Sequence, residues 1–173
     1  IILENLRFFE GEIGKSIELA EKLASFSDIY VNEAFGVSHR AHASVALVPK
    51  FLPHYGGFHL QKEVKILSSI LENPKRPLTI IIGGAKIETK LPLVEKMTNF
   101  ADFILIGGKV AGEYRASSSS QKAKIVVAEL NSDKTDVVSQ SLQEFLEIIS
   151  KSRCVVWNGP LGFVEKGFGD SSL

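Results

Sequence analysis

The sequence LTIIIGGAK at residues 78–86 decides the fold. Its first five residues form an apolar run with one threonine, which is typical of a strand buried on both faces of a parallel sheet. Gly83 and Gly84 then allow a sharp turn, and a helix is expected to follow at once. The stretch therefore predicts a strand, a glycine turn and a helix, the repeating unit of an α/β fold.

Three similar runs follow at DFILI (102–106), KIVVA (124–128) and RCVVW (153–157). Successive strands begin 22 to 29 residues apart, close to the length of a β-α-β unit. We therefore predict a Rossmann-like open parallel sheet with flanking helices. The interval 110–121 leaves room for only a short helix before the serine run 117–120, so a shortened connection is expected there.

The residues before this sheet predict part of a second α/β domain. Apolar side chains recur at 13, 17, 20 and 24, which predicts a helix over 13–26, followed by a strand at 29–31 and a polar loop at 32–44. A long amphipathic helix is expected between Gly56-Gly57 and Asn73-Pro74, with apolar residues at 60, 64, 67 and 71. A helix between two such ends is a candidate connector of two domains.

Composition predicts a globular chain and excludes several other classes. The 173 residues are 45% hydrophobic and 23% charged, enough for a real core. Twenty basic residues balance twenty acidic ones, so no overall field attracts nucleic acid or an anionic membrane, and an anion site must be local. The single Cys154 is expected to be buried and inert, and no run is long enough to span a bilayer. A cytoplasmic protein is predicted.

Glycines follow three of the four predicted strands, at Gly83-Gly84, at Gly107-Gly108 and in the run 158–162. Ligands bind beyond the carboxyl ends of parallel strands, and glycine lets a backbone approach a phosphate at a helix N-terminus. The alternative is that these glycines only form turns. Because three such loops share one sheet edge, an anion or nucleotide site is favoured, although neither familiar phosphate-binding motif is present.

Two groups of cations could hold such ligands. Lys86 and Lys90 are four residues apart at a predicted helix N-terminus, where an anion would compensate them, unless they are ordinary solvated lysines. Arg7 and Arg40 could grip a small phosphorylated acid through their guanidinium groups. His39 and His42 lack further ligands at metal-site spacing, so a metal site is disfavoured. For His42 the leading alternative is a loop histidine that bonds to backbone.

Six segments, in order along nearly the whole chain, resemble the phosphoglycerate kinase family. They are LENLRF (3–8), YVNEAFGVSHRAHAS (30–44), LENPKRP (71–77), IIGGAKIETK (81–90), LIGG (105–108) and VVWNGPLGFVE (155–165). The resemblance implies reversible phosphoryl transfer from 1,3-bisphosphoglycerate to ADP, giving 3-phosphoglycerate and ATP in glycolysis, with Mg²⁺ accompanying the nucleotide. It also implies a hinge-bending, cytoplasmic enzyme, expected to be a monomer with neither nucleic-acid nor membrane partners.

The resemblance also implies a role for individual residues. Residues expected to bind phosphoglycerate are Arg7, His39 and Arg40. Lys86 is expected to follow the transferring phosphoryl group as the catalytic lysine. Residues expected to bind nucleotide are Lys86, Lys90, Gly84, Gly107, Gly108, Asn158 and Glu165. The implied domains are the end of the phosphoglycerate domain at 1–55, a connector helix at 56–74 and an incomplete nucleotide domain at 75–173.

The chain also departs from the family pattern. The family's segments ahead of Ile1, and the later segment whose aspartate binds Mg²⁺, are missing, so the fragment alone is expected to be inactive and the metal ligand to lie outside it. Asp170 is not assigned to metal, and Lys109 replaces a third glycine. A dehydrogenase is disfavoured because its glycine fingerprint is absent. A non-catalytic nucleotide-binding or interaction protein that reuses a truncated kinase fold stays the alternative.

Overall fold

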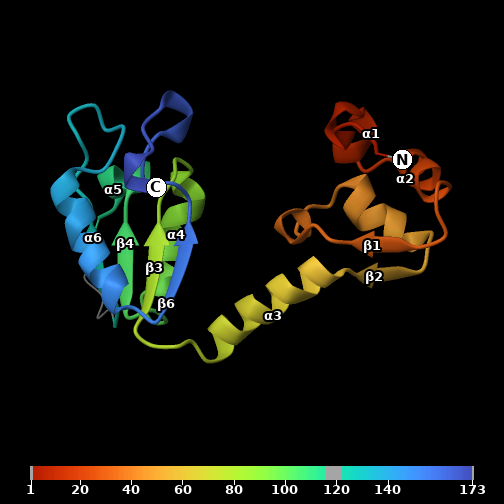
Figure 1. Ribbon diagram of the computed structural model, residues 1–173. Coiled ribbons are helices and arrows are strands. Elements are labelled where there is room, and N and C mark those ends of the chain that lie inside the picture. Colours follow the sequence, from red (N-terminus) through yellow and green to blue (C-terminus); the bar gives the residue numbers. More distant parts are fainter. Residues whose placement is uncertain (1, 116–121, 173) are drawn as a thin grey trace. The chain divides into compact units, whose positions relative to one another are not determined.

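The computed structural model describes residues 2–115 and 122–172. The chain divides into two compact units, Ile1–Asn73 and Pro74–Leu173, and Figure 1 labels the helices and strands of each. The second unit contains the sheet predicted from residues 78–86. Each unit has its own packing.

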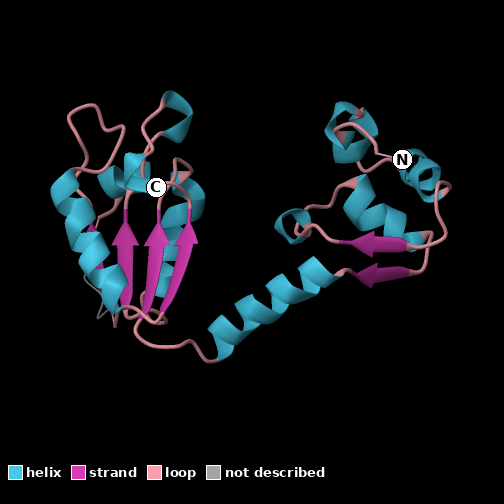
Figure 2. Cartoon of the chain, viewed as in Figure 1, coloured by secondary structure: helices cyan, strands magenta, loops and turns pink. Residues whose placement is uncertain are grey.

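The second unit is built on a four-stranded sheet, and the prediction of an open parallel sheet is confirmed (Figure 2). Its strands are β3 (Leu78–Ile82), β4 (Phe103–Ile106), β5 (Lys124–Val127) and β6 (Cys154–Asn158). All neighbours are parallel, in the order β5-β4-β3-β6. All five residues of β3 are buried, as predicted from its apolar run with a single threonine.

The connections place helices on both faces of this sheet (Figure 1). The helices are α4 (Ile87–Met97), α5 (Gly108–Glu113) and α6 (Ser139–Lys151). The chain runs outward from β3 to β5 and then returns to β6 on the other side of β3. With right-handed crossovers this reversal puts α6 on the face opposite α4 and α5, and it makes the β3/β6 boundary the expected ligand position.

One face of the sheet packs on α6 through a fully buried Phe145. The buried side chains of this cluster include Ile81, Leu105 and Val126 from the three neighbouring strands. Outside this core, the edge strand β6 is partly open, and Cys154 is only half-buried. The expectation of a fully buried thiol is therefore wrong, because no further strand covers that edge in the part of the chain described.

The first unit has a smaller core. It contains α1 (Glu10–Ile13), α2 (Ile17–Ala24) and α3 (Phe58–Glu72), with a parallel pair of short strands, β1 (Tyr30–Asn32) and β2 (His54–Gly56). Short turns of 3-10 or π helix lie at Leu6–Phe8, Phe35–Val37, Ala43–Leu47 and Val48–Lys50. The buried residues at its centre are Ala20, Ala24 and Val48.

The single helix predicted over 13–26 is wrong, because the structure divides it into α1 and α2. Lys15 adopts a left-handed backbone with φ of 59°, which breaks the helix after Gly14. Ser16 then starts the second helix, since its Oγ accepts a hydrogen bond from the Leu19 N–H at 3.1 Å. Ile13 and Ile17 are 60% and 61% exposed, so they do not form the buried face that their spacing indicated.

Helix α3 has the bounds predicted for the connector helix, Phe58–Glu72. None of its residues is buried, and the apolar side chains of Leu67 and Leu71 are exposed. In residues 2–115 and 122–172, no helix has the length and apolar character needed to cross a bilayer. The serine run 117–120 lies outside the described residues.

Replacing Phe145 by alanine should destabilise the second unit by about 3–5 kcal/mol, because it leaves a cavity between α6 and the sheet. Urea unfolding followed by the fluorescence of Trp157, the chain's single tryptophan, measures this change. The matched control is Leu146→Ala on the same helix, where the side chain is 48% exposed and a loss below about 1 kcal/mol is expected. Equal losses in the two variants would contradict the assigned packing.

Candidate functional site

The loops after β3, β4 and β6 meet at the carboxyl edge of the sheet through backbone hydrogen bonds. The Gly83 N–H donates to the Asn158 carbonyl at 3.0 Å, and the Gly84 N–H donates to the Pro160 carbonyl at 2.8 Å. The Gly107 N–H donates to the Ile82 carbonyl at 2.9 Å. These bonds place the glycine loops at the topological switch between β3 and β6, where a ligand is expected.

Close packing explains glycine at two of these positions. Gly159 has a φ of +93°, and a Cβ there would lie 2.5 Å from the Gly83 carbonyl oxygen. Gly108 has a φ of +59°, and its Cβ would lie 2.9 Å from the Gly84 nitrogen. A side chain would force the loops apart, so glycine at 108 and 159 is explained without a ligand. The feature that favours a ligand is therefore the space that the loops enclose.

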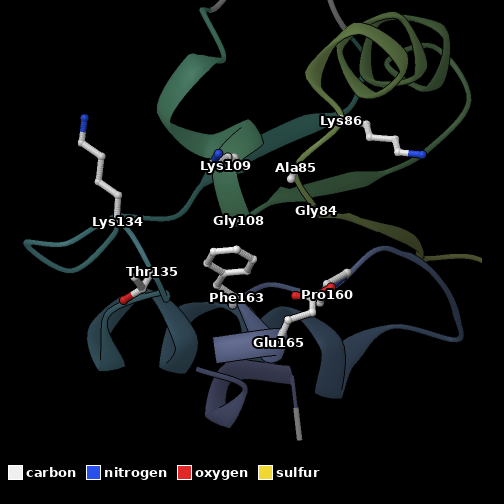
Figure 3. Close-up of a pocket in the computed structure, with 11 residues that line it drawn as sticks. Gly84, Ala85, Lys86, Gly108, Lys109, Lys134, Thr135, Pro160, Phe163 and Glu165 are labelled. Carbon is white, nitrogen blue, oxygen red and sulfur yellow. The ribbon is translucent and has the colours of Figure 1, made fainter. Parts of the chain in front are cut away.

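That space is a cavity of about 270 Å³ (Figure 3). Four loops line it, with residues 84–86, 108–109, 134–135 and 160, 162, 163 and 165. Four of the residues predicted for the nucleotide site therefore share one cavity, namely Gly84, Lys86, Gly108 and Glu165. Much of its wall is glycine backbone, which allows a ligand to approach the main chain closely.

The charge around the cavity is positive although the chain as a whole is neutral. Lys86, Lys109 and Lys134 line it, against the single carboxylate of Glu165. In Figure 3 the Lys86 side chain extends away from the centre of the cavity. Three lysines that line one cavity make its surroundings positive, which favours an anion with several charges, such as a nucleotide polyphosphate.

Lys90 and Asn158 lie beside the cavity and contact each other. The Lys90 ammonium donates to the Asn158 side-chain oxygen, which joins α4 to the end of β6. Burial lowers the pKa of Lys90 below the usual range of lysine, and the positive charge of Lys86 lowers it further. The two lysines therefore repel each other, as expected for cations that share the start of one helix.

Several lining residues were not predicted. Lys134 and Thr135 are positioned by a turn in which the Asn131 side-chain oxygen accepts from the Thr135 N–H at 2.8 Å. This loop also follows a strand, but it contains no glycine, the residue type from which the other loops of the site were predicted. Pro160 and Phe163 lie in the segment 155–165 that carried the family resemblance, but they were not selected from it.

The predicted phosphoglycerate residues lie in the first unit. Arg7 is in the turn Leu6–Phe8, and His39 and Arg40 are in the loop after β1, all with exposed side chains. Within the described part of the chain, no hydrogen bond or ion pair connects these three side chains. The structure therefore leaves them available to a ligand without assembling them into a closed site.

The loop that carries His39 and Arg40 is anchored by a buried carboxylate. Glu12, 3% exposed, accepts from the Ser44 N–H at 3.0 Å and from the Ser44 hydroxyl at 2.6 Å. The His42 Nδ1 lies 3.6 Å from Glu12 Oε1, so this histidine faces the carboxylate that anchors the loop. Over the described residues, no three His, Cys, Asp or Glu side chains are grouped closely enough to hold a metal ion.

The sequence profile of phosphoglycerate kinase matches residues 1–134. The chain belongs to the phosphoglycerate kinase family. It is 37% identical to the phosphoglycerate kinase of a Wolbachia strain from Drosophila simulans, over 95% of this chain and 53% of the relative. It is 46% identical to that of Bdellovibrio bacteriovorus, over 64% of this chain and 28% of the relative.

Solved structures of the family have the same fold. The phosphoglycerate kinase from Pyrococcus horikoshii has a TM-score of 0.72 at 25% identity, with 95% of this chain and 55% of that chain covered. The enzyme from Coxiella burnetii has a TM-score of 0.66 at 27% identity, with 93% and 54% covered. The chain spans about half the length of the relatives it matches.

The chain is also shorter than its relatives inside the matched region. The match to the Wolbachia kinase extends over 211 residues, more than the 173 residues of the whole chain. This chain therefore lacks residues that the relative has inside the matched region, while the shortened connection within 110–121 stays a prediction. Most of that predicted position, 116–121, lies outside the described residues.

Replacing Lys86 by glutamine should raise the pKa of Lys90, because it removes the neighbouring positive charge. The pKa should stay below that of a free lysine, because the burial of Lys90 remains. A nuclear magnetic resonance titration of the Lys90 side-chain carbon signals measures the change. Lys96→Gln, in the last turn of the same helix, is the control and should leave the pKa of Lys90 where it is.

Replacing Glu12 by alanine should release the loop around Ser44, because the hydroxyl and the N–H of that residue lose their acceptor. The expected loss is about 1–3 kcal/mol in the free energy of opening at this position. Hydrogen exchange of the Ser44 amide measures it. Glu10→Ala, at an exposed position of the same helix, should exchange like the parent chain, and an unchanged Ser44 rate in Glu12→Ala would contradict the anchor.

Proposed function

We propose that this chain is part of a phosphoglycerate kinase, which transfers a phosphoryl group reversibly from 1,3-bisphosphoglycerate to ADP and yields 3-phosphoglycerate and ATP. Membership of the family supports this activity. The observation that carries the proposal is the glycine-walled cavity with three lysines at the carboxyl edge of the sheet. A polyphosphate ligand suits both its position and its charge.

The second unit would bind the nucleotide. Residues proposed to contact it are Gly84, Lys86, Lys90, Gly107, Gly108, Asn158 and Glu165. Gly84, Gly108 and Glu165 line the cavity, where backbone and carboxylate could receive a nucleoside. Lys90 and Asn158 are hydrogen-bonded to each other beside it. An entering phosphate could replace the Asn158 oxygen as the acceptor of the Lys90 ammonium.

The proposed reaction requires positioning and charge neutralisation more than proton transfer. The oxygen that accepts or releases the phosphoryl group belongs to a carboxylate or acyl phosphate, so no general base has to ionise it. Catalysis then depends on aligning the two ligands and stabilising charge on the transferring group. Lys86, whose ammonium is not held by any described partner, would supply that charge as the catalytic lysine.

The first unit would bind the phosphoglycerate. Arg7 and Arg40, with His39 beside Arg40, are the proposed contacts, and their exposed side chains are free to grip carboxylate and phosphate oxygens. We assign 1–55 to this domain, 56–74 to the connector and 75–173 to the nucleotide domain. Hinge movement about the connector would bring the two ligands together for transfer.

Mg²⁺ would accompany the nucleotide, but the described residues do not provide a site for it. Glu165 is the single carboxylate among the described residues that line the cavity, and three lysines line the same cavity. We therefore assign no metal ligand to this chain and no step to the ion. We also propose that the enzyme acts in the cytoplasm as a monomer, without nucleic-acid or membrane partners.

In a full-length phosphoglycerate kinase that contains this chain, Lys86→Ala should lower kcat by roughly 10²- to 10³-fold, because it removes a charge that acts on the transferring group. The affinity for ADP should fall much less. Steady-state kinetics together with calorimetric titration of ADP separate the two effects. Lys96→Ala on the same helix is the control and should change neither quantity.

Two results would contradict this proposal in different ways. Equal losses of kcat and ADP affinity in Lys86→Ala would remove the proposed catalytic role of the lysine. Failure of the full-length protein to transfer the phosphoryl group, with ADP still bound, would favour the alternative of a non-catalytic nucleotide-binding protein. The present chain alone is expected to bind ADP without turning it over.

A further inference from the structure

Side-chain hydrogen bonds join two of the loops that line the cavity. The loop between β5 and α6 brings Lys134 and Thr135 to it, and the segment after β6 brings Pro160, Phe163 and Glu165. In Figure 3, Thr135 and Pro160 lie on opposite sides of Phe163. The distance between these two loops therefore contributes to the width of the cavity.

Asp136 connects the two loops. Its Oδ1 accepts from the Ser171 hydroxyl, 35 residues farther along the chain, and from the Val137 N–H at 2.8 Å. Ser171 is only 7% exposed, so water competes little for the bond between the two side chains. A hydrogen bond that a carboxylate accepts is stronger than one between neutral groups. The Asp136–Ser171 pair is therefore suited to hold the two loops together.

Gly162 leaves room for this carboxylate. A Cβ at Gly162 would lie 2.5 Å from Asp136 Oδ1, too close for a real contact. Gly162 itself lines the cavity, whereas Asp136 is not among the described residues that line it. The carboxylate therefore lies directly behind the cavity wall, and a change in its position would move that wall.

Two further hydrogen bonds hold the same segments. The Phe163 N–H donates to the Thr135 carbonyl at 2.8 Å, which also joins the two loops. The Leu161 N–H donates to the Ser172 Oγ at 2.9 Å, which ties the start of the segment after β6 to its later turn, Asp170–Ser172. Because the contact of the carboxylate with this turn is made by two side chains, it can be removed while these backbone N–H groups stay in place.

From these contacts we propose that Asp136 is a positioning residue, which holds the loop between β5 and α6 against the segment after β6 and keeps the cavity at the width that a nucleotide requires. The inference rests on the proposed function, because it assumes that the cavity binds a nucleotide. Asp136 acts on the ligand through Gly162 and Thr135, without touching it. A cavity whose walls are fixed before binding loses less conformational freedom when the ligand enters, so the contact raises affinity.

The charge of Asp136 by itself would have the opposite effect on an anion. Three lysines line the cavity, and a carboxylate close behind its wall weakens their attraction for a polyphosphate. Removing that carboxylate would therefore tighten ADP binding if only charge mattered. If Asp136 positions the loops, the same change weakens ADP binding. The two roles thus differ in the sign of the effect.

Calorimetric titration of the present chain with ADP tests this role. Asp136→Ala and Ser171→Ala each remove the bond between the loops, and each should weaken ADP binding roughly 5- to 30-fold, the effect of losing one partner of a shielded hydrogen bond. Ser171→Ala leaves the charge of Asp136 in place, so its effect cannot come from charge, and it decides the test if Asp136→Ala does not fold. Ser171→Thr keeps the hydroxyl and should retain most of the affinity.

Asp133→Ala is the matched control, because Asp133 has an exposed side chain on the same loop and is not among the described residues that line the cavity. It removes the same charge without removing the bond, so it should bind ADP at least as tightly as the parent chain. In a full-length phosphoglycerate kinase that contains this chain, Ser171→Ala should raise the KM for ADP and leave kcat and the KM for 3-phosphoglycerate unchanged.

Unchanged or tighter ADP binding in Ser171→Ala would overturn the positioning role and leave the proposed function intact. An equal loss of affinity in Ser171→Thr would also overturn it, because the hydroxyl would then not matter. So would a fall in kcat with an unchanged KM for ADP, because the pair would then only support the fold. If the parent chain binds no ADP, the nucleotide site fails, and the positioning role with it.

Discussion

The parallel pairing of β3 with β4 and β6 is the interaction on which the site depends. Ile82, the last residue of β3, pairs with Ile106 on one side and with Asn158 on the other. The glycine loops start directly after these three residues, so the register of the sheet fixes the height at which each loop leaves it. A slip of one residue in either pairing would separate the Gly83 and Asn158 backbones and open the cavity.

This dependence explains why the second unit was largely predictable from sequence. A strand that is buried on both faces needs an apolar residue at nearly every position, and LTIII satisfies that need for β3. The first unit has no such strand. Its helix over 13–26 was predicted from apolar spacing alone, and spacing does not detect a backbone break at Lys15 or the exposure of Ile13 and Ile17. Both depend on local conformation and on what covers the helix.

The same contrast holds within the site. Gly84 and Gly108 could be found from the sequence because both have left-handed backbones, with φ of +95° and +59°, and such a backbone favours glycine. Thr135 was missed because its position depends on a turn closed by the Asn131 side chain. An asparagine in a loop is compatible with many turn types, so it does not predict this one. Phe163 was missed for another reason, since a phenylalanine in sequence gives no sign of whether it will be buried or will line a cavity.

The positive charges around the cavity explain how a chain with no net charge could still bind an anion. Twenty positive and twenty negative residues cancel over the chain, but Lys86 and Lys90 are close enough to lower the pKa of Lys90. In the free protein their repulsion, together with burial, makes the charged form of Lys90 less favourable. A bound polyphosphate would reverse the first of these effects, because an anion between two cations stabilises both. The unfavourable proximity of Lys86 and Lys90 is thus a source of affinity for an anion.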